Sequence, residues 1–264
     1  MLPHLDFHLF GLDMHLHTNT YMMVFYGIFA ILAFAFSFRK ERKTLGAFIY
    51  ALTLGVVALF GARLFHLTVE KPISEFSLDQ MLHFDGMTFY GSLIAGLIVA
   101  ILLTPIIFKR EHYAKVADVT AILTAAGYGF LRIGCFANGC CWGKLTAVPW
   151  AVRYTESTVM PALGLPVHPV QLYDSFVGFL IAGVLLYLHR SEKTRTEFKG
   201  LLMPIFLIAY SFGRMATEFY RGDGYRGENV FLIFSTSQTI SLVVAAIGAV
   251  ALVVLLKRRR PEHV

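Results

Sequence analysis

Residues 89–108 read FYGSLIAGLIVAILLTPIIF and contain no charged side chain. A helix needs roughly 20 apolar residues to cross the hydrocarbon core of a bilayer, so this stretch predicts a membrane-spanning helix. The whole chain has the same character. Of its 264 residues 56% are hydrophobic and 15% charged, and the mean hydropathy is +0.63. Soluble domains usually carry about 25% charged residues, so the composition argues against a soluble enzyme, a disordered chain or a disulfide scaffold.

Six further apolar runs bring the expected number of spans to seven. They cover about 21–38, 45–67, 116–136, 172–188, 201–219 and 230–256. Pro105 and Pro204 fall inside spans, where neighbouring helices can satisfy the backbone groups that a proline frees. The sequence therefore predicts an all-α, polytopic integral membrane protein, with residues 1–264 forming a single transmembrane domain.

The basic residues gather after every second span. Fifteen of the 23 Lys and Arg residues lie in 39–43, 109–115, 190–199 and 257–260. Cytoplasmic loops carry the excess of Lys and Arg, so the N-terminus is expected outside and the C-terminus in the cytoplasm. Residues 135–168 would form a small extracytoplasmic cap. Residues 1–18 are interpreted as an interfacial lead-in, and a metal site made by their four histidines is the alternative.

A polar stripe runs along the sixth expected span. Tyr210, Arg214, Glu218 and Arg221 are spaced so that they fall on one face of a helix. The stripe is either a structural ion pair between Arg214 and Glu218 or an anion site with a neighbouring carboxylate.

A second polar place follows the fourth span. Arg132 is expected to end a helix, and Gly134, Gly139 and Gly143 then punctuate a tight turn that also holds Asn138. Glycine permits close backbone approach, and backbone N–H groups beside an arginine suit a phosphate. An ordinary loop with an interfacial tryptophan is the alternative.

Two more places lie at the starts of spans. His168, Gln171 and Asp174 are expected to share one face, while Pro169 is typical of a helix start. Tyr90 lies in a glycine-flanked aromatic segment, where a packed interfacial tyrosine is the plainer interpretation. By the expected topology all these residues face the outer leaflet, which favours an anionic phospholipid head group as the substrate.

These motifs resemble, over almost the full chain, those of bacterial phosphatidylglycerol–prolipoprotein diacylglyceryl transferases. Residues 25–27 (FYG) and 61–65 (GARLF) resemble motifs of the family's first two spans, and 89–93 (FYGSL) stand where it has Phe-His-Gly-Gly-Leu. Residues 132–143 (RIGCFANGCCWG) resemble Arg-Ile-Gly-Asn-Phe-x-Asn-Gly-Glu-x-x-Gly, and 168–174 (HPVQLYD) resemble His-Pro-x-Gln-Leu-Tyr-Glu. Tyr210, Arg214 and Glu218 match the family's sixth span.

The resemblance implies an enzyme of the bacterial cytoplasmic (inner) membrane that acts at the outer leaflet. A lipobox cysteine thiol of a preprolipoprotein would attack phosphatidylglycerol, and glycerol 1-phosphate would leave, with no metal, diffusible cofactor or nucleic acid. Arg132 and Arg214 would stabilise the departing phosphate, Glu218 would orient Arg214 or accept the thiol proton, and Tyr26 and Tyr210 would contact the head group. Tyr90 completes the catalytic set, and further substrate contacts are expected from Gly134, Asn138, Gly143, His168, Gln171 and Arg221.

Four positions depart from the family pattern. Tyr90 replaces a histidine, Cys135 an asparagine, Cys140 a glutamate, and Asp174 a glutamate. A phenol with a pKa near ~10 is a poorer base than an imidazole near ~6.5. The departures indicate a divergent member with a rearranged proton relay. A paralogue with another acceptor and a non-enzymatic lipid-binding or transport protein remain alternatives.

The cysteines Cys135, Cys140 and Cys141 leave several possibilities open. Cys135 could pair with either of the others in a disulfide on the oxidising side of the membrane. Buried free thiols and a reactive thiol are alternatives. Zinc is disfavoured, because three cysteines with no evident fourth ligand make a poor structural site.

Overall fold

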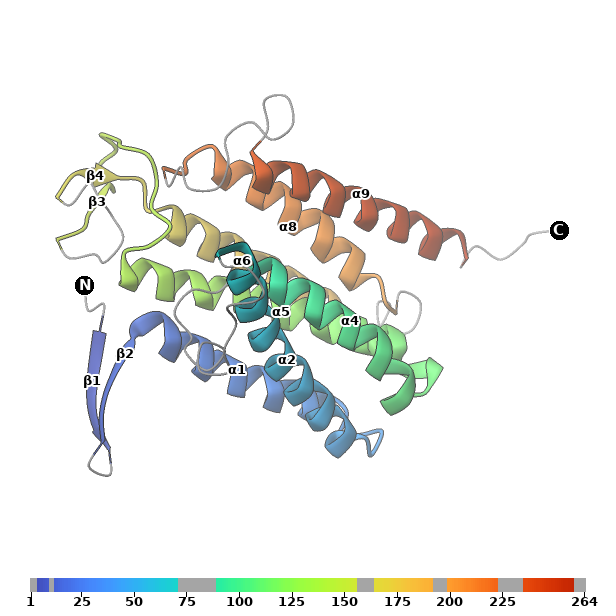
Figure 1. Ribbon diagram of the computed structural model, residues 1–264. Helices are drawn as coiled ribbons and strands as arrows, with labels where there is room; N and C mark the ends of the chain where they lie inside the picture. Colours follow the sequence, from blue (N-terminus) through green and yellow to red (C-terminus); the bar gives the residue numbers. More distant parts are fainter. Residues whose placement is uncertain are drawn as a thin grey trace. The chain divides into compact units, whose positions relative to one another are not determined.

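The structure, a computed structural model, describes residues 4–9, 12–70, 89–155, 164–191, 199–222 and 235–258. Within these residues the chain is dominated by seven α-helices (Figure 1). They are α1 (Thr18–Ser37), α2 (Thr44–Glu70), α4 (Phe89–Ile107), α5 (Tyr113–Asn138), α6 (Val170–Arg190), α8 (Leu202–Glu218) and α9 (Thr236–Lys257). Each helix coincides with one of the apolar runs of the sequence, so the predicted all-α class is confirmed.

Five of these helices are long and apolar enough to cross a membrane, namely α1, α2, α5, α6 and α9. In α4 the apolar part Ile94–Ile107 is shorter, and α8 has 17 residues. Large hydrophobic side chains such as Phe25, Ile101 and Val250 are exposed on the helix surfaces, as expected for side chains that face lipid. The chain is therefore a membrane protein.

The contacts divide the chain into two compact units, residues 27–113 and residues 1–26 with 114–264. In the first unit α2 packs against α4. A Cβ added to Gly61 would lie 2.4 Å from the Cβ of Ala95, so only glycine permits this approach. Phe38, Tyr50 and Phe108 form an aromatic cluster at the other end of these helices. The single domain predicted from sequence stays a prediction.

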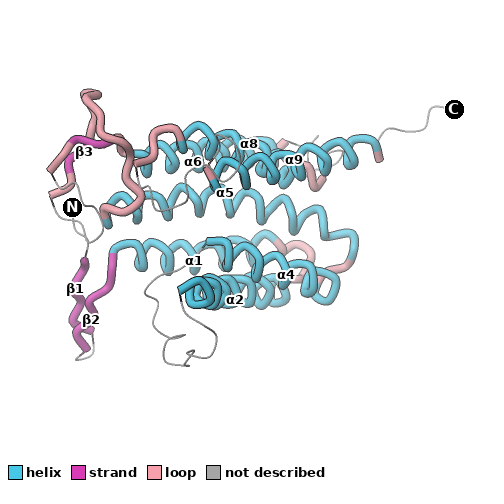
Figure 2. The backbone as a smooth tube through the Cα atoms, turned by 45° about the horizontal axis from the view of Figure 1, so that its top comes forward, coloured by secondary structure: helices cyan, strands magenta, loops and turns pink. Residues whose placement is uncertain are grey.

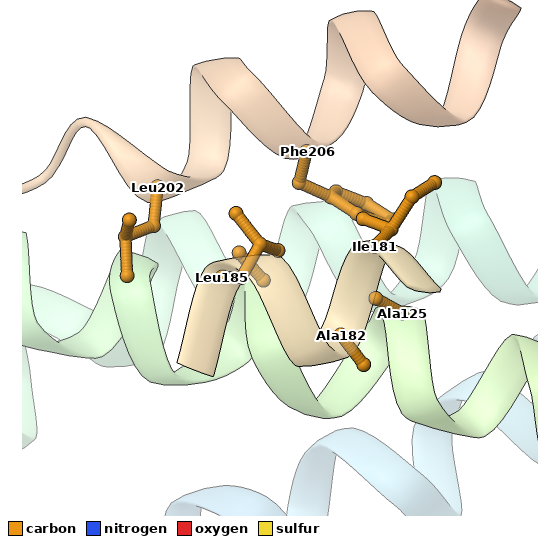
Figure 3. Close-up of a cluster of buried hydrophobic side chains, with 7 residues drawn as sticks. Ala125, Ile181, Ala182, Leu185, Leu202 and Phe206 are labelled. Carbon is orange, nitrogen blue, oxygen red and sulfur yellow. The ribbon is translucent and has the colours of Figure 1, made fainter. Parts of the chain in front are cut away.

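The second unit is built on α5, α6, α8 and α9, with α6 packed on α8 and α8 on α9. Its core includes Ala125, Ile181, Leu185, Leu202 and Phe206 (Figure 3). Gly178 of α6 crosses Gly129 of α5 closely, since a Cβ on Gly178 would lie 2.7 Å from the Gly129 nitrogen. Ser175 Oγ also donates to the Gly129 carbonyl at 2.9 Å.

Two polar devices fix helix starts in this unit. The buried Asp118 of α5 accepts hydrogen bonds from Gly200 N at 2.7 Å and Leu202 N at 3.0 Å, which satisfies amides at the start of α8. At the start of α9, Ser235 and Gln238 form a reciprocal capping box.

The structure adds detail to one local expectation and corrects another. Strands β1 (His4–Leu9) and β2 (Leu12–His17) pair antiparallel within the stretch interpreted as an interfacial lead-in, an interpretation that stays a prediction (Figure 2). Arg132 does not end its helix: α5 continues to Asn138, and Gly139 then turns the chain with φ +70°. A glycine in the left-handed conformation is a common way for a helix to end.

Part of the expected cap is also described. Strands β3 (Val152–Arg153) and β4 (Pro166–Val167) pair antiparallel. Beneath them Trp142, Tyr154 and Val167 form a small buried cluster. Residues 156–163 lie outside the described part of the chain.

Candidate active site

The first buried ion pair joins α5 to α6. Arg132 Nε lies 3.2 Å from Asp174 Oδ2, and the Asp174 side chain is 1% exposed. The guanidinium of Arg132 lies over the ring of Tyr128, 5.0 Å from its centroid. A buried charge needs a partner, so Asp174 and Arg132 hold each other in place.

The second ion pair lies on α8. Arg214 Nη2 is 2.5 Å from Glu218 Oε2, and Arg221 Nε is 3.7 Å from the same oxygen. Ser235 donates to Glu218 Oε1 at 2.9 Å, and Arg214 also contacts the hydroxyls of Thr217 and Ser237, each at 3.3 Å. One carboxylate therefore holds two arginines and the start of α9. The ion pair between Arg214 and Glu218, one of the two alternatives considered from the sequence, is therefore present.

Two tyrosines connect the pairs. Tyr128 of α5 and Tyr210 of α8 meet edge to face with centroids 5.1 Å apart. Each lies one turn before an arginine on its helix, Tyr128 before Arg132 and Tyr210 before Arg214. Sequence reasoning missed Tyr128, although the repeated spacing Tyr-x-x-x-Arg was a signal that could have found it.

Backbone hydrogen bonds join three segments that are far apart in the sequence. Gly143 N donates to the His168 carbonyl at 3.1 Å, and Lys144 N donates to the Tyr220 carbonyl at 2.8 Å. Gly222 N donates to the Trp142 carbonyl at 3.1 Å. A Cβ on Gly143 would lie 2.5 Å from the His168 carbonyl oxygen, which explains the glycine. The loop after α5, the approach to α6 and the end of α8 thus form one frame.

Gln171 ties this frame to the cap. Its Nε2 donates to the Cys140 carbonyl at 2.7 Å and to the Tyr154 hydroxyl at 3.0 Å. Burial raises the pKa of Tyr154 to about 12, and the Gln171 hydrogen bond acts in the opposite direction. Three buried acceptors, Asn138 Oδ1, Gln171 Oε1 and Asp174 Oδ1, have no hydrogen-bond partner within the described residues. Such atoms can accept from a bound ligand.

His168 does not share the helical face expected for it. It precedes α6, because the helix begins at Val170 after Pro169, and only Gln171 and Asp174 lie on the helix. His168 Nδ1 is 3.2 Å from the Tyr173 hydroxyl, and its ring is 5.1 Å from that of Tyr220. Trp150 donates to the same Tyr173 hydroxyl at 2.7 Å. His168 therefore belongs to an aromatic cluster beside the arginines.

The three cysteines lie together at the end of α5. None of the three is in a disulfide, all are of intermediate exposure, and their sulfur atoms lie within 4.8 Å of one another. Hydrogen bonds with Cys135 and Cys140 lower the pKa of Cys141, and the positive charges of Arg132 and Arg221 lower it further against the effect of burial. The hydrogen bonds with Cys135 and Cys141, together with burial, raise the pKa of Cys140.

Tyr26, Gly134 and Tyr90 are also expected site residues, and for Tyr90 the structure describes only the backbone. The Tyr26 hydroxyl donates to the Leu123 carbonyl, and its ring stacks on Phe130 at 5.4 Å. Gly134 is buried within α5, before the turn. The backbone of Tyr90 lies in the first turn of α4, and its side chain is outside the described residues.

The fold and site define an all-α membrane protein with two arginines, each held by a carboxylate, a site suited to an anionic ligand. A family model described as "Prolipoprotein diacylglyceryl transferase" matches residues 7–254. The chain belongs to this family, and it is therefore a bacterial membrane enzyme of the transferase class.

Curated relatives are similar over different lengths. A phosphatidylglycerol–prolipoprotein diacylglyceryl transferase of Clostridium tetani is 39% identical over 62% of this chain and 62% of its own length. One of Coxiella burnetii is 32% identical over 95% of each chain. A second relative with this activity in its name, from Clostridium perfringens, is 31% identical over 81% of this chain and 78% of its own.

Proposed function

We propose that this enzyme transfers the diacylglyceryl group of phosphatidylglycerol to the lipobox cysteine thiol of preprolipoproteins and releases glycerol 1-phosphate. The observation that carries the proposal is the two ion-paired arginines, Arg132 held by the buried Asp174 and the buried Arg214 held by Glu218. The family to which the chain belongs and the names of its relatives indicate which reaction this is. In this reaction the thiol sulfur bonds to the glycerol carbon, the carbon–oxygen bond to phosphate breaks, and the thiol proton is released.

The arginines have the form that phosphate stabilisation requires. Arg132 meets Asp174 through Nε, and its two terminal nitrogens make no hydrogen bond within the described part of the chain. The guanidinium fork matches two phosphate oxygens. Donors that are held in place before the reaction stabilise the charge of a departing group at little reorganisation cost. We assign Arg132 and Arg214 to that role.

Glu218 is assigned to positioning rather than to proton transfer. It already contacts Arg214, Arg221 and the Ser235 hydroxyl. A carboxylate used in this way orients arginines for the phosphate. The three buried acceptors of Asn138, Gln171 and Asp174 suit the hydroxyl groups of the glycerol head group, which donate hydrogen bonds.

We further propose seven spans in the bacterial inner membrane, with the N-terminus outside and the site facing the outer leaflet. In the larger unit, α5 and α8 end where α6 and α9 begin, and the ion pairs lie at this end (Figure 1). Lys115, Arg190 and Lys257 lie at the opposite helix ends. The positive-inside rule assigns that opposite end to the cytoplasm.

The test is release of glycerol phosphate by the purified protein from phosphatidylglycerol vesicles. A synthetic lipobox peptide is the acceptor, and the same peptide with serine in place of its cysteine is the control. We expect release with the cysteine peptide alone, together with a diacylglyceryl peptide in the mass spectrum. Lipid binding without release contradicts the proposal and directs the search to another acceptor or to a lipid-binding role.

A further inference from the structure

The loop after α5 gathers every cysteine of the chain. Cys135 lies in the last turn of the helix, and Cys140 and Cys141 follow the Gly139 turn. All three sulfur atoms lie within 4.8 Å of one another. A disulfide would use two of them, whereas a metal ion would use all three.

The backbone is bent to achieve this convergence. Cys140 N donates to the Cys135 carbonyl at 3.1 Å, which folds the chain back on the helix end. Cys141 has φ +62°, a left-handed conformation that is uncommon for a residue other than glycine. Side chains of adjacent residues in an extended chain point to opposite faces. Here both neighbouring thiols lie beside Cys135.

The cluster is held in place from outside the loop and is accessible. Gln171 fixes the Cys140 carbonyl from α6. Intermediate exposure of the three cysteines leaves a route for an ion and for a further ligand.

We infer that Cys135, Cys140 and Cys141 bind a zinc ion as three thiolates and that its fourth position takes the acceptor cysteine of the lipoprotein precursor. Zinc–sulfur bonds are about 2.3 Å long, so a tetrahedral site places its sulfurs about 3.8 Å apart, inside the observed limit. Zinc sites that act on substrates have three protein ligands and one open position. The missing fourth ligand, which argues against a structural zinc site, is what this role requires.

This inference rests on the proposed transferase function and supplies a step that function lacks. Glu218 is assigned to positioning by its contacts with Arg214, Arg221 and Ser235, so the proposed function names no group that takes the proton of the acceptor thiol. A thiol that coordinates zinc is deprotonated, and its proton passes to water. The thiolate sulfur then gives an electron pair to the glycerol carbon, and the phosphate oxygen takes the pair of the broken carbon–oxygen bond. The thioether product is a weaker ligand and leaves the ion.

The first test measures metal in the full-length protein purified in detergent under reducing conditions. We expect about one zinc ion per chain. Cys135→Ser and Cys141→Ser should each lower bound zinc by about tenfold or more, while His168→Ala, beside the loop but outside the cluster, should retain it. Absence of zinc from wild-type protein with three titratable thiols overturns the inference, as does a disulfide between any two of them. Loss of zinc in His168→Ala overturns the ligand set.

The second test asks whether the acceptor enters the fourth position. With Co²⁺ in place of zinc, we expect thiolate charge-transfer absorption and the visible bands of a tetrahedral site. The cysteine lipobox peptide should shift the visible bands, and the serine peptide should not. If the cysteine peptide leaves the cobalt spectrum unchanged, the acceptor cysteine does not bind the metal and this part of the inference is wrong.

The two proposals fail in different ways. Zinc binding and a peptide-dependent cobalt spectrum, without transfer to the peptide, count against the proposed function alone. Lipobox transfer by protein that contains no zinc counts against the metal site alone.

Discussion

At the scale of single residues, the Arg132–Asp174 pair links two helices through a side chain that water does not reach. Removing one partner of a buried ion pair leaves an uncompensated charge and typically costs about 3–5 kcal/mol. Asp174 is 1% exposed, so water cannot replace the lost partner.

We therefore expect Asp174→Asn to lower thermal stability in detergent and to reduce lipobox transfer about tenfold or more. Asp174→Glu, which places the family's usual residue at this position, is the matched control and should keep both properties. Equal melting temperatures for wild type and Asp174→Asn contradict the pairing.

The arginines are tested directly by truncation. Arg132→Ala and Arg214→Ala should each lower transfer by about 10²–10³, because each removes a donor held ready for the departing phosphate. Arg153 of the cap is exposed and donates to the Gly164 carbonyl, so Arg153→Ala is the control with unchanged transfer. If Arg132→Ala or Arg214→Ala transfers at the wild-type rate, the arginine concerned does not stabilise the departing phosphate.

The sequence predicted the charged members of the site better than their partners. Arg132, Arg214 and Glu218 were found because charges inside apolar runs are costly and need a reason. Ser235 and Ser237 were not predicted, because a hydroxyl at the start of an apolar run costs little free energy to place there and so does not stand out in the sequence. Their contacts with Glu218 and Arg214 depend on how α9 packs on α8.

At the scale of elements, close helix crossings decide where the site residues lie. Gly178 of α6 approaches the backbone of α5 at Gly129 and Ala125, one turn beyond Asp174. An added methyl group must separate the two helices, because backbone atoms cannot move aside.

Gly178→Ala is expected to destabilise the protein by about 1–3 kcal/mol and to weaken transfer, since α5 carries Arg132 and α6 carries Asp174. On the same helix a Cβ at Gly183 meets no atom within 4 Å, so Gly183→Ala is the control. Thermal unfolding in detergent measures both. If Gly178→Ala and Gly183→Ala melt at the same temperature, the close approach of α6 to α5 at Gly178 is contradicted.

Helix positions followed from apolar length, but turns and strands did not. The pairing of β1 with β2 had a signal in the sequence, namely the alternation of apolar and polar residues within 4–9 and 12–17, but the histidines drew attention to a metal site instead. The end of α5 was placed too early because an arginine was taken as the end of a span. In the structure Asp174 compensates that arginine, so the helix continues past it.

At the scale of the whole molecule, the membrane orientation is open to experiment. A fluorescent reporter fused after Arg258 should be active in the cytoplasm, and alkaline phosphatase fused after Thr155 of the cap should be active outside it. The reason is that basic residues flank the helix ends near Arg258, while the site end carries the cap. Inactive phosphatase at Thr155, beside an active fusion after Arg258, contradicts the outer-leaflet site.

The hydrogen bonds that join Gly143, Lys144 and Gly222 to His168, Tyr220 and Trp142 use main-chain atoms alone. Main-chain amides and carbonyls are the same whichever side chains the neighbouring positions carry. The anchoring of the loop therefore does not depend on the side chains of Cys135 and Cys140, and substitutions at these two positions can change the chemistry of the loop while these hydrogen bonds remain. Gly143 and Gly222 have to stay, because an added Cβ on either would lie 2.5 Å from a backbone oxygen.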